Sequence, residues 1–290
     1  MNEDTKKTDI VYVLKDSSTN NYAELRLSLR TLKNLNKGNY GTVFIVSKTV
    51  PTWCKDVVHI KQADDKGKSF LNSLAKVEAA CKDKRVSENF ILMNDDFFIL
   101  KEIKQITNTY VGYLKDKIVA KRKILTGSNY MGILLRTLQL NPKTLDFTTH
   151  KPIVISKEDF MQLTSKYDMT KGYSWRCLYG TEFQDSLSPE ISADHKVFHI
   201  GDLALVEDED IISIDDKIMK EFRWIDFILL QVPSASPYEK RMPPRVEVVV
   251  IKPFKDSDNN GNVVSLNAVK KVGSRRAIEL ILKGLARLKE

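Results

Sequence analysis

The amino-acid sequence predicts an α/β fold in which a sheet of parallel type is flanked by helices. In the first 100 residues, short apolar runs alternate with longer segments whose apolar residues recur at helical spacing. This alternation is typical of parallel sheets with helices on their faces. The composition, 42% hydrophobic and 29% charged over 290 residues, is that of an ordinary globular protein, and we expect no membrane span.

The first part of the chain contains four expected strands and two expected helices. The strands are DIVYVLKD (9–16), TVFIVS (42–47), VVHIKQ (57–62) and NFILMNDDFFIL (89–100). One helix is expected over NYAELRLSLRTLKNLN (21–36), where Arg26 and Arg30 lie four residues apart on one face. The other is expected over KSFLNSLAKVEAACKD (68–83).

The later part of the larger domain is less regular. HKPIVISKEDFMQLTSKY (150–167) predicts a strand followed by a helix that begins after Ser156. Ser156 is the expected N-cap, with Asp159 as the acid three residues on, a variant of the capping box. EFRWIDFILLQVPSASPYE (221–239) predicts a helix that ends before Pro233.

A short linker, MPPR (242–245), separates two predicted domains, 1–240 and 241–290. The second is a small α+β module, with an alternating strand at 245–254 and an amphipathic helix at 274–288. From Arg241 onward there are 11 Lys and Arg against 5 Asp and Glu, so +6 of the net charge of +8 lies there. Such a basic tail indicates either an acidic partner or a solvated surface.

The three cysteines, Cys54, Cys81 and Cys177, form no CxxC pair. The polar N-terminus MNEDTKKTD has no apolar segment of the kind found in signal peptides. We therefore expect a cytoplasmic protein with reduced thiols that pack as small buried hydrophobes.

Two adjacent acids, Asp95 and Asp96, stand at or near the end of the fourth expected strand. Ligands of open α/β sheets bind beyond the carboxyl ends of the strands. Mg²⁺ and Mn²⁺ are commonly held there by one or two carboxylates together with substrate phosphates. The pair therefore favours a clamp for a metal ion and a diphosphate. The alternative is an ordinary loop entry, since Asp is common in turns.

Several segments, in order, resemble phage and bacterial glycosyltransferase-like proteins of GT-A type. The same segments are similar to the first conserved regions of the Stealth family of capsular-polysaccharide hexose-phosphate transferases. The segments are YAELRLSLRTLKN, TVFIVSKTVPTWC, KSFLNSLAKVEAA, SENFILMNDDFFIL, HKPIVISKEDF, SWRCLYG and VPSASPYE, spread over residues 9–239. Cys177 and Thr181 depart from the expected pattern, as does EDEDIISIDD (207–216).

The resemblance implies a GT-A-like, Rossmann-like mixed sheet that binds a nucleotide-sugar, UDP- or GDP-linked, with Mn²⁺ or Mg²⁺. Asp95 and Asp96 would form the metal and diphosphate site. The motifs put further residues on the donor side: Asp16 near the nucleotide, Arg26 and Arg30 at phosphate, and Lys68 and Asn72 facing the donor. His150 and Arg176 match the His and the Arg of two further segments, on the acceptor or phosphate side. Without the resemblance, Arg26 and Arg30 would be assigned to a solvated helix face.

The C-terminal module, RVEVVVIKPFKD…VKKVGSRRAIELILKGLARL, resembles a small module of phage head and tail proteins. That resemblance implies a phage origin and contact with a virion protein or nucleic acid. A stabilising appendage without a ligand is the alternative.

We therefore expect a metal-dependent glycosyltransferase whose acceptor is a glycan, a virion protein or modified DNA. One alternative is a Stealth-like hexose-phosphate transferase. A non-catalytic phage binding or virion-associated protein is the other. Asp185, Asp194 and His150 are all candidates for the general base.

Overall fold

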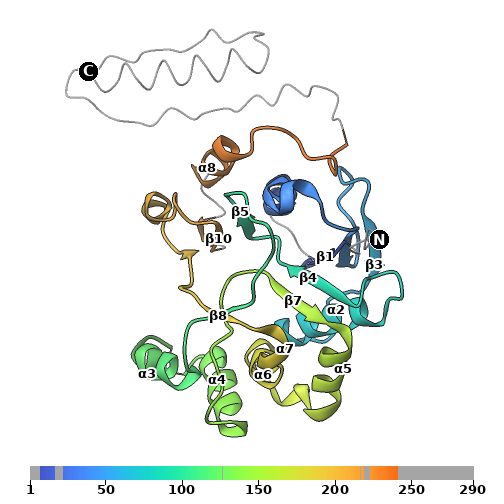
Figure 1. Ribbon diagram of the computed structural model, residues 1–290. Helices are drawn as coiled ribbons and strands as arrows, with labels where there is room; N and C mark the ends of the chain where they lie inside the picture. The colour runs from blue at the N-terminus through green and yellow to red at the C-terminus, as the bar shows by residue number, and fades with distance from the viewer. Residues whose placement is uncertain (1–6, 17–21, 126, 216, 219–222, 241–290) are drawn as a thin grey trace, which may run out of the picture. The chain divides into compact units, whose positions relative to one another are not determined.

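Five strands form the main sheet of the computed structural model, which describes residues 7–16, 22–125, 127–215, 217–218 and 223–240. The strand order is β3-β2-β1-β4-β7. β1 (Asp9–Val13), β2 (Val43–Ser47), β3 (Val58–Lys61) and β4 (Asn89–Met93) run parallel, and β7 (Ile153–Ser156) pairs antiparallel with β4. The predicted α/β class with a parallel-rich sheet flanked by helices is confirmed (Figure 1).

Both faces of this sheet are buried, because alternate residues of each central strand enter two different hydrophobic clusters. Val11, Phe44 and Leu92 belong to one cluster, which also receives residues of α2 (Ser69–Lys82), α5 (Lys157–Lys166) and α6 (Trp175–Glu182). Tyr12 and Ile45 point into the other cluster, together with residues of α1 (Ala23–Thr31). Parallel strands covered on both faces need such near-continuous apolar runs.

The expected helices are present with shorter or shifted bounds. The 68–83 prediction corresponds to α2, and the 21–36 prediction to α1 followed by short 3-10 turns at Leu32–Asn34 and Asn36–Gly38. Ser156 caps α5 as predicted, since its side chain accepts a hydrogen bond from the backbone N of Asp159. α8 (Arg223–Gln231) ends before Pro233.

The segment 89–100 is two strands rather than one, which corrects the sequence prediction. β4 ends at Met93, the chain turns through Asn94, Asp95 and Asp96, and β5 (Phe97–Ile99) begins a different sheet. Periodicity could not reveal the break, because both strands are buried and apolar. The turn therefore places the two acids at the junction of two sheets.

The second sheet has the order β5-β10-β9. β10 (Ile211–Ile214) pairs antiparallel with β5 and parallel with β9 (Lys196–Val197). Phe98, Ile212 and Ile214 pack there against Trp224 and Ile228 of α8. This small sheet forms one wall beside the turn that contains Asp95 and Asp96.

The remaining elements lie mainly between β5 and β10 in the sequence. They are β6 (Thr109–Tyr110), α3 (Leu114–Leu125), α4 (Asn129–Leu140), a 3-10 turn at Met169–Lys171, α7 (Gln184–Leu187), β8 (Glu190–Ile191) and a 3-10 turn at Ile200–Leu205. α3 and α4 pack together around Leu114, Met131 and Leu134 (Figure 1). Within the described ranges, no helix has the length and apolar character to cross a bilayer. The predicted module 241–290 lies outside the described residues.

Candidate functional site

Asp95 and Asp96 lie half-buried in the turn at the carboxyl end of β4. Oδ2 of Asp96 accepts a 2.8 Å hydrogen bond from Oγ of Ser213 in β10. The same oxygen lies 3.6 Å from Nζ of Lys196 in β9. The Asp96 carboxylate is therefore fixed by the second sheet, while its turn belongs to the end of the first.

The strand register explains why Ser213 and Lys196 meet the same carboxylate. Ser213 is paired with Lys196 in the parallel β9–β10 ladder and with Phe97 in the antiparallel β5–β10 ladder. Directly paired residues present their side chains on the same face of a sheet. The small sheet therefore presents a hydroxyl and an ammonium together toward Asp96.

His150 is held by Asp194 through two contacts. The ring Nδ1 lies 2.8 Å from Oδ2 of Asp194, and the backbone N of His150 donates to Oδ1 at 3.2 Å. Burial alone would raise the pKa of Asp194, but the hydrogen bond and attraction to His150 outweigh it, so the pKa is lowered. The ionised carboxylate can only accept, so Nδ1 carries a hydrogen, and in the neutral form of the ring the lone pair is therefore on Nε2.

Arg176, in the first turn of α6, is a cation in a desolvated position. Burial lowers its pKa to about 10, opposed by nearby charges that include the carboxylates of Asp194 and Asp96. One terminal nitrogen donates to the backbone O of Lys151 at 2.7 Å, but buried Nε has no hydrogen-bond partner among the described residues. A buried donor without a partner is costly, so Arg176 is suited to receive an anion.

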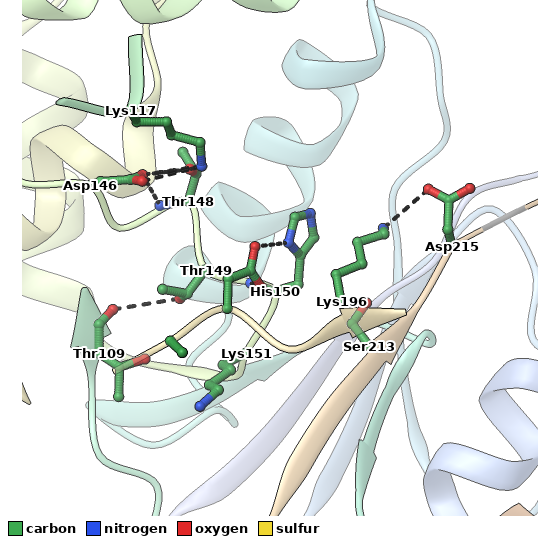
Figure 2. A network of polar contacts seen from close by, with 12 residues as sticks. Thr109, Lys117, Asp146, Thr148, Thr149, His150, Lys151, Lys196, Ser213 and Asp215 are labelled. Carbon is green, nitrogen blue, oxygen red and sulfur yellow. Dashed lines mark hydrogen bonds and ion pairs between the residues drawn. The ribbon is translucent and has the colours of Figure 1, made fainter. Parts of the chain in front are cut away.

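The glycine of the SWRCLYG segment allows α6 to come close to the segment that carries His150. A Cβ at Gly180 would lie 2.4 Å from the ring of Phe147, which is itself buried. Only a residue without a side chain fits this approach. Figure 2 shows the surrounding polar network, in which the Lys196 amine is directed toward Asp215 and the His150 ring contacts a carboxylate.

The structure brings two of the four predicted catalytic residues, His150 and Arg176, to one place, because Arg176 donates to the backbone O of Lys151, the residue after His150, and Asp194 holds the His150 ring. Asp96 contacts Ser213 and Lys196 instead. Asp185, the third candidate for the general base, lies exposed on α7. Lys151, next to His150, donates to Oγ of Ser192 at 2.8 Å, and burial lowers the pKa of its amine.

Asp16 fixes the carboxyl ends of three parallel strands. Its carboxylate accepts from the backbone N of Lys48 at 3.1 Å and from that of Asp64 at 2.7 Å, and its own backbone N donates to Asp64. Nζ of Lys76, whose exposed fraction is 2%, lies 2.5 Å from Asp64 and 3.7 Å from Asp16. The sheet edge where the nucleotide is predicted to bind is therefore stabilised by a buried ion cluster.

Tyr22 feels charges from both this edge and the acidic turn. Burial, followed by the charges of Asp16 and Asp95, raises the pKa of its phenol. Asp16 and Asp95 therefore both act on one side chain, at the carboxyl ends of β1 and β4.

The two arginines of α1 lie against the last described segment of the chain. Arg30 donates two 2.7 Å hydrogen bonds to the Glu239 carboxylate, and the guanidinium of Arg26 lies 4.5 Å from the ring centre of Trp53. The ELRLSLR, PTWC and SPYE motifs are thus brought into one cluster. Any phosphate bound by Arg30 would have to replace Glu239.

Lys68 and Asn72 lie at the start of α2. Lys68 is exposed at the N-cap position, and Oδ1 of Asn72 accepts from the backbone N of Lys66 at 2.8 Å, which orders the preceding turn. Among the described residues, no hydrogen bond or ion pair joins either of them to Asp96, His150 or Arg176. Two surface cavities, of about 350 and 340 Å³, are lined by other residues than the predicted site residues.

The residues around the turn suit a hard divalent cation only with help from a substrate. Among the residues that the structure describes, no three His, Cys, Asp or Glu side chains form a complete metal site. Asp95 and Asp96 would supply carboxylate oxygens, and Mg²⁺ normally keeps water and substrate phosphates as further ligands. The donor set therefore fits a cation that binds together with a diphosphate.

Sequence reasoning missed Lys196, Ser213 and Asp215 as neighbours of the acidic pair. The alternation of IISI before Asp215 indicates a strand, but only the strand pairing shows that Ser213 faces Asp96. The only sequence signal for Lys196 was that it follows Asp194, a candidate general base, by two residues. Neither residue type is diagnostic alone.

No family model matches the sequence, and no curated protein matches it. Among solved structures, the chain is similar to galactosyltransferase LgtC in complex with donor and acceptor sugar analogues. The TM-score is 0.42 at 8% identity, over 77% of this chain and 96% of that one. It is also similar to the WbbM bifunctional glycosyltransferase, with a TM-score of 0.40 at 12% identity. The match covers 80% of this chain and 50% of that one. A third similar structure is mouse xyloside xylosyltransferase 1, with a TM-score of 0.35 at 10% identity. The match covers 73% of this chain and 98% of that one.

Proposed function

We propose that this chain is a metal-dependent glycosyltransferase that uses a nucleotide-sugar donor, UDP- or GDP-linked. The observations that carry the proposal are the acidic turn, which Ser213 fixes at the junction of two sheets, and the His150–Asp194 pair, next to which the half-buried Arg176 donates to Lys151. The proposed acceptor is a glycan, a virion protein or modified DNA.

Asp95 and Asp96 would hold the divalent ion, Mn²⁺ or Mg²⁺, together with the donor diphosphate. When bound, such an ion supplies positive charge to the leaving diphosphate as a Lewis acid. Ser213 contributes by fixing Asp96, so that little reorganisation is needed when the ligand binds. Asp16, Lys68 and Asn72 remain proposed donor contacts, and Arg26 and Arg30 remain proposed phosphate contacts.

His150 would act as the general base. Its Nε2 lone pair accepts the proton of the acceptor hydroxyl as the hydroxyl oxygen bonds to the anomeric carbon. The bond from that carbon to the diphosphate breaks, and the nucleoside diphosphate leaves with the electron pair. Asp194 stabilises the imidazolium that forms, because the carboxylate stays ionised.

Arg176 would stabilise negative charge on phosphate oxygens. Nε of its guanidinium has no hydrogen-bond partner within the part of the chain that the structure describes, and a phosphate oxygen would satisfy it with a charge-assisted hydrogen bond. This same feature favours a second candidate, a Stealth-like hexose-phosphate transferase. In that reaction the acceptor hydroxyl would attack phosphorus, and nearby cations would supply most of the stabilisation.

Product analysis separates the candidates. The protein is incubated with UDP- and GDP-sugars and Mn²⁺, and nucleotides are resolved by chromatography. Glycosyl transfer releases a nucleoside diphosphate, phosphosugar transfer releases a nucleoside monophosphate, and the Asp95→Asn and Asp96→Asn variants should each lose at least about 100-fold of the activity. No donor hydrolysis by wild type, together with no loss of binding in the Asp95 and Asp96 variants, would favour a non-catalytic phage binding or virion-associated protein.

We also propose a cytoplasmic location, which suits the three free, buried thiols. The basic residues of 241–290 are proposed to contact a virion protein or nucleic acid.

A further inference from the structure

Lys196 is a mostly buried cation whose contacts are loose. Its side chain is 13% exposed, and Nζ lies 3.6 Å from Oδ2 of Asp96 and 3.9 Å from Oδ2 of Asp215. Neither distance is within ordinary hydrogen-bond range. Within the described chain, its ammonium makes no hydrogen bond to either carboxylate or to any other group.

Another buried lysine of the same chain shows what a structural ion pair looks like here. Nζ of Lys76 makes a direct 2.5 Å hydrogen bond to Asp64 and also donates to the backbone O of Leu14. A buried amine gains most when its three hydrogens are used in this way. Lys196 is held in position by charge but keeps its hydrogen-bonding capacity for another acceptor.

The position of Lys196 indicates which acceptor that is. The amine lies 3.6 Å from the carboxylate predicted to bind metal and diphosphate, and Ser213, its partner in the strand ladder, donates to the same oxygen. Arg176 also interacts with the charge of Asp96. Lys196 therefore lies beside the acidic turn, and among the described residues both Lys196 and Arg176 keep side-chain hydrogens that make no hydrogen bond.

We propose that Lys196 is a diphosphate-binding residue. Its ammonium donates hydrogen bonds to non-bridging oxygens of the donor diphosphate and stabilises the charge that builds on the leaving nucleoside diphosphate. Asp96 and Asp215 keep the amine positioned before the ligand binds. This inference rests on the proposed function and adds to it a residue that none of the sequence motifs contains.

The test is isothermal titration calorimetry of the full chain with UDP and GDP in the presence of Mn²⁺. The Lys196→Met variant removes the charge at similar length, Lys196→Arg keeps it, and Lys101→Met is the matched control. Lys101 is a surface lysine that also pairs with a carboxylate, Asp208, at 3.4 Å. Uridine and guanosine, which have no phosphates, are titrated in parallel.

Lys196→Met should bind the nucleoside diphosphate about 10- to 100-fold more weakly, the loss expected for a charged hydrogen bond. Its nucleoside affinity should be unchanged, Lys196→Arg should recover part of the loss, and Lys101→Met should behave as wild type. If Lys196→Met does not fold, Lys196→Gln, which retains a donor, replaces it under the same expectation.

Equal diphosphate affinity for wild type and the neutral variant would overturn the role of Lys196 while leaving the proposed function intact. An equal loss for nucleoside and diphosphate would also overturn it, because that result indicates a purely structural role. If wild type binds no nucleotide at all, the proposed function itself fails and this inference fails with it.

Discussion

At the scale of single residues, the contact between His150 and Asp194 decides which ring nitrogen can act as a base. Because Asp194 accepts from Nδ1, the lone pair is left on Nε2. An Asn in place of Asp194 has the same shape but can donate to Nδ1 instead, which would leave the hydrogen on Nε2 and remove the basic nitrogen from the site.

We therefore predict that Asp194→Asn lowers kcat by about 10²- to 10⁴-fold, the usual contribution of a general base, with a much smaller change in KM. His150→Ala should lose a similar factor, and the double variant should lose little more. Steady-state kinetics with the best donor measures these values. Asp185→Asn is the control, since Asp185 is exposed on α7. A large kcat loss in the control with none in Asp194→Asn would refute the assignment.

The site residues that could be predicted from the sequence are those that lie within the recognised motifs. The sequence placed Asp96, His150 and Arg176 among the candidates, and Arg176 donates to the residue that follows His150. It did not identify Lys196 or Ser213, because a lysine and a serine in short strands have no distinctive spacing. Their role depends on pairing between segments more than 100 residues apart, which no local pattern encodes.

At the scale of elements, the segment that ends the described chain stabilises α1. Glu239 accepts two hydrogen bonds from Arg30 and one from the backbone N of Ser236, and the backbone N of Lys240 donates to the O of Trp53. Burial by itself would raise the pKa of Glu239, but the Arg30 hydrogen bond and charge lower it. Glu239 is 9% exposed, so these bonds are well shielded from water.

Glu239→Gln should therefore lower the free energy of unfolding by about 3 kcal/mol at pH 7, the cost of breaking a mostly buried pair. Because the folded-state pKa of Glu239 lies below the ordinary glutamate value of 4.5, this stabilisation is complete above pH 4.5 and is lost as the pH falls through the folded value. Urea unfolding at pH 7 and near pH 3 measures it. The difference between wild type and variant should shrink in acid, and a constant difference would contradict this explanation.

Element boundaries were predictable where capping chemistry is local, as at Ser156 and Pro233. They were not predictable in the run 89–100, where two apolar strands follow one another. The aspartates interrupt this run because the chain passes from one sheet to another there. The polar interruption was correctly noticed, and only its structural cause was missed.

At the scale of the whole molecule, the described chain is a parallel-rich sheet whose last strand, β7, runs antiparallel, beside a small mixed sheet. Alternating strands and helices were sufficient to predict the parallel part. The antiparallel direction of β7 and the pairing of β5 with β10 were not predictable, because both depend on contacts between segments that are far apart in the sequence. The pairing of β5 with β10 places the residues of the second sheet beside the acidic turn at the end of β4.

The most direct measurement of the central claim is calorimetric binding of UDP and GDP to wild type, with Mn²⁺ and with EDTA, and to the Asp95→Asn/Asp96→Asn double variant. If the acidic turn binds the donor through a divalent ion, at least one nucleotide should bind wild type only with Mn²⁺. The double variant should lose about 100-fold or more in affinity, as removal of charged ligands predicts. Nucleotide binding of equal strength in EDTA and in the double variant would contradict the account.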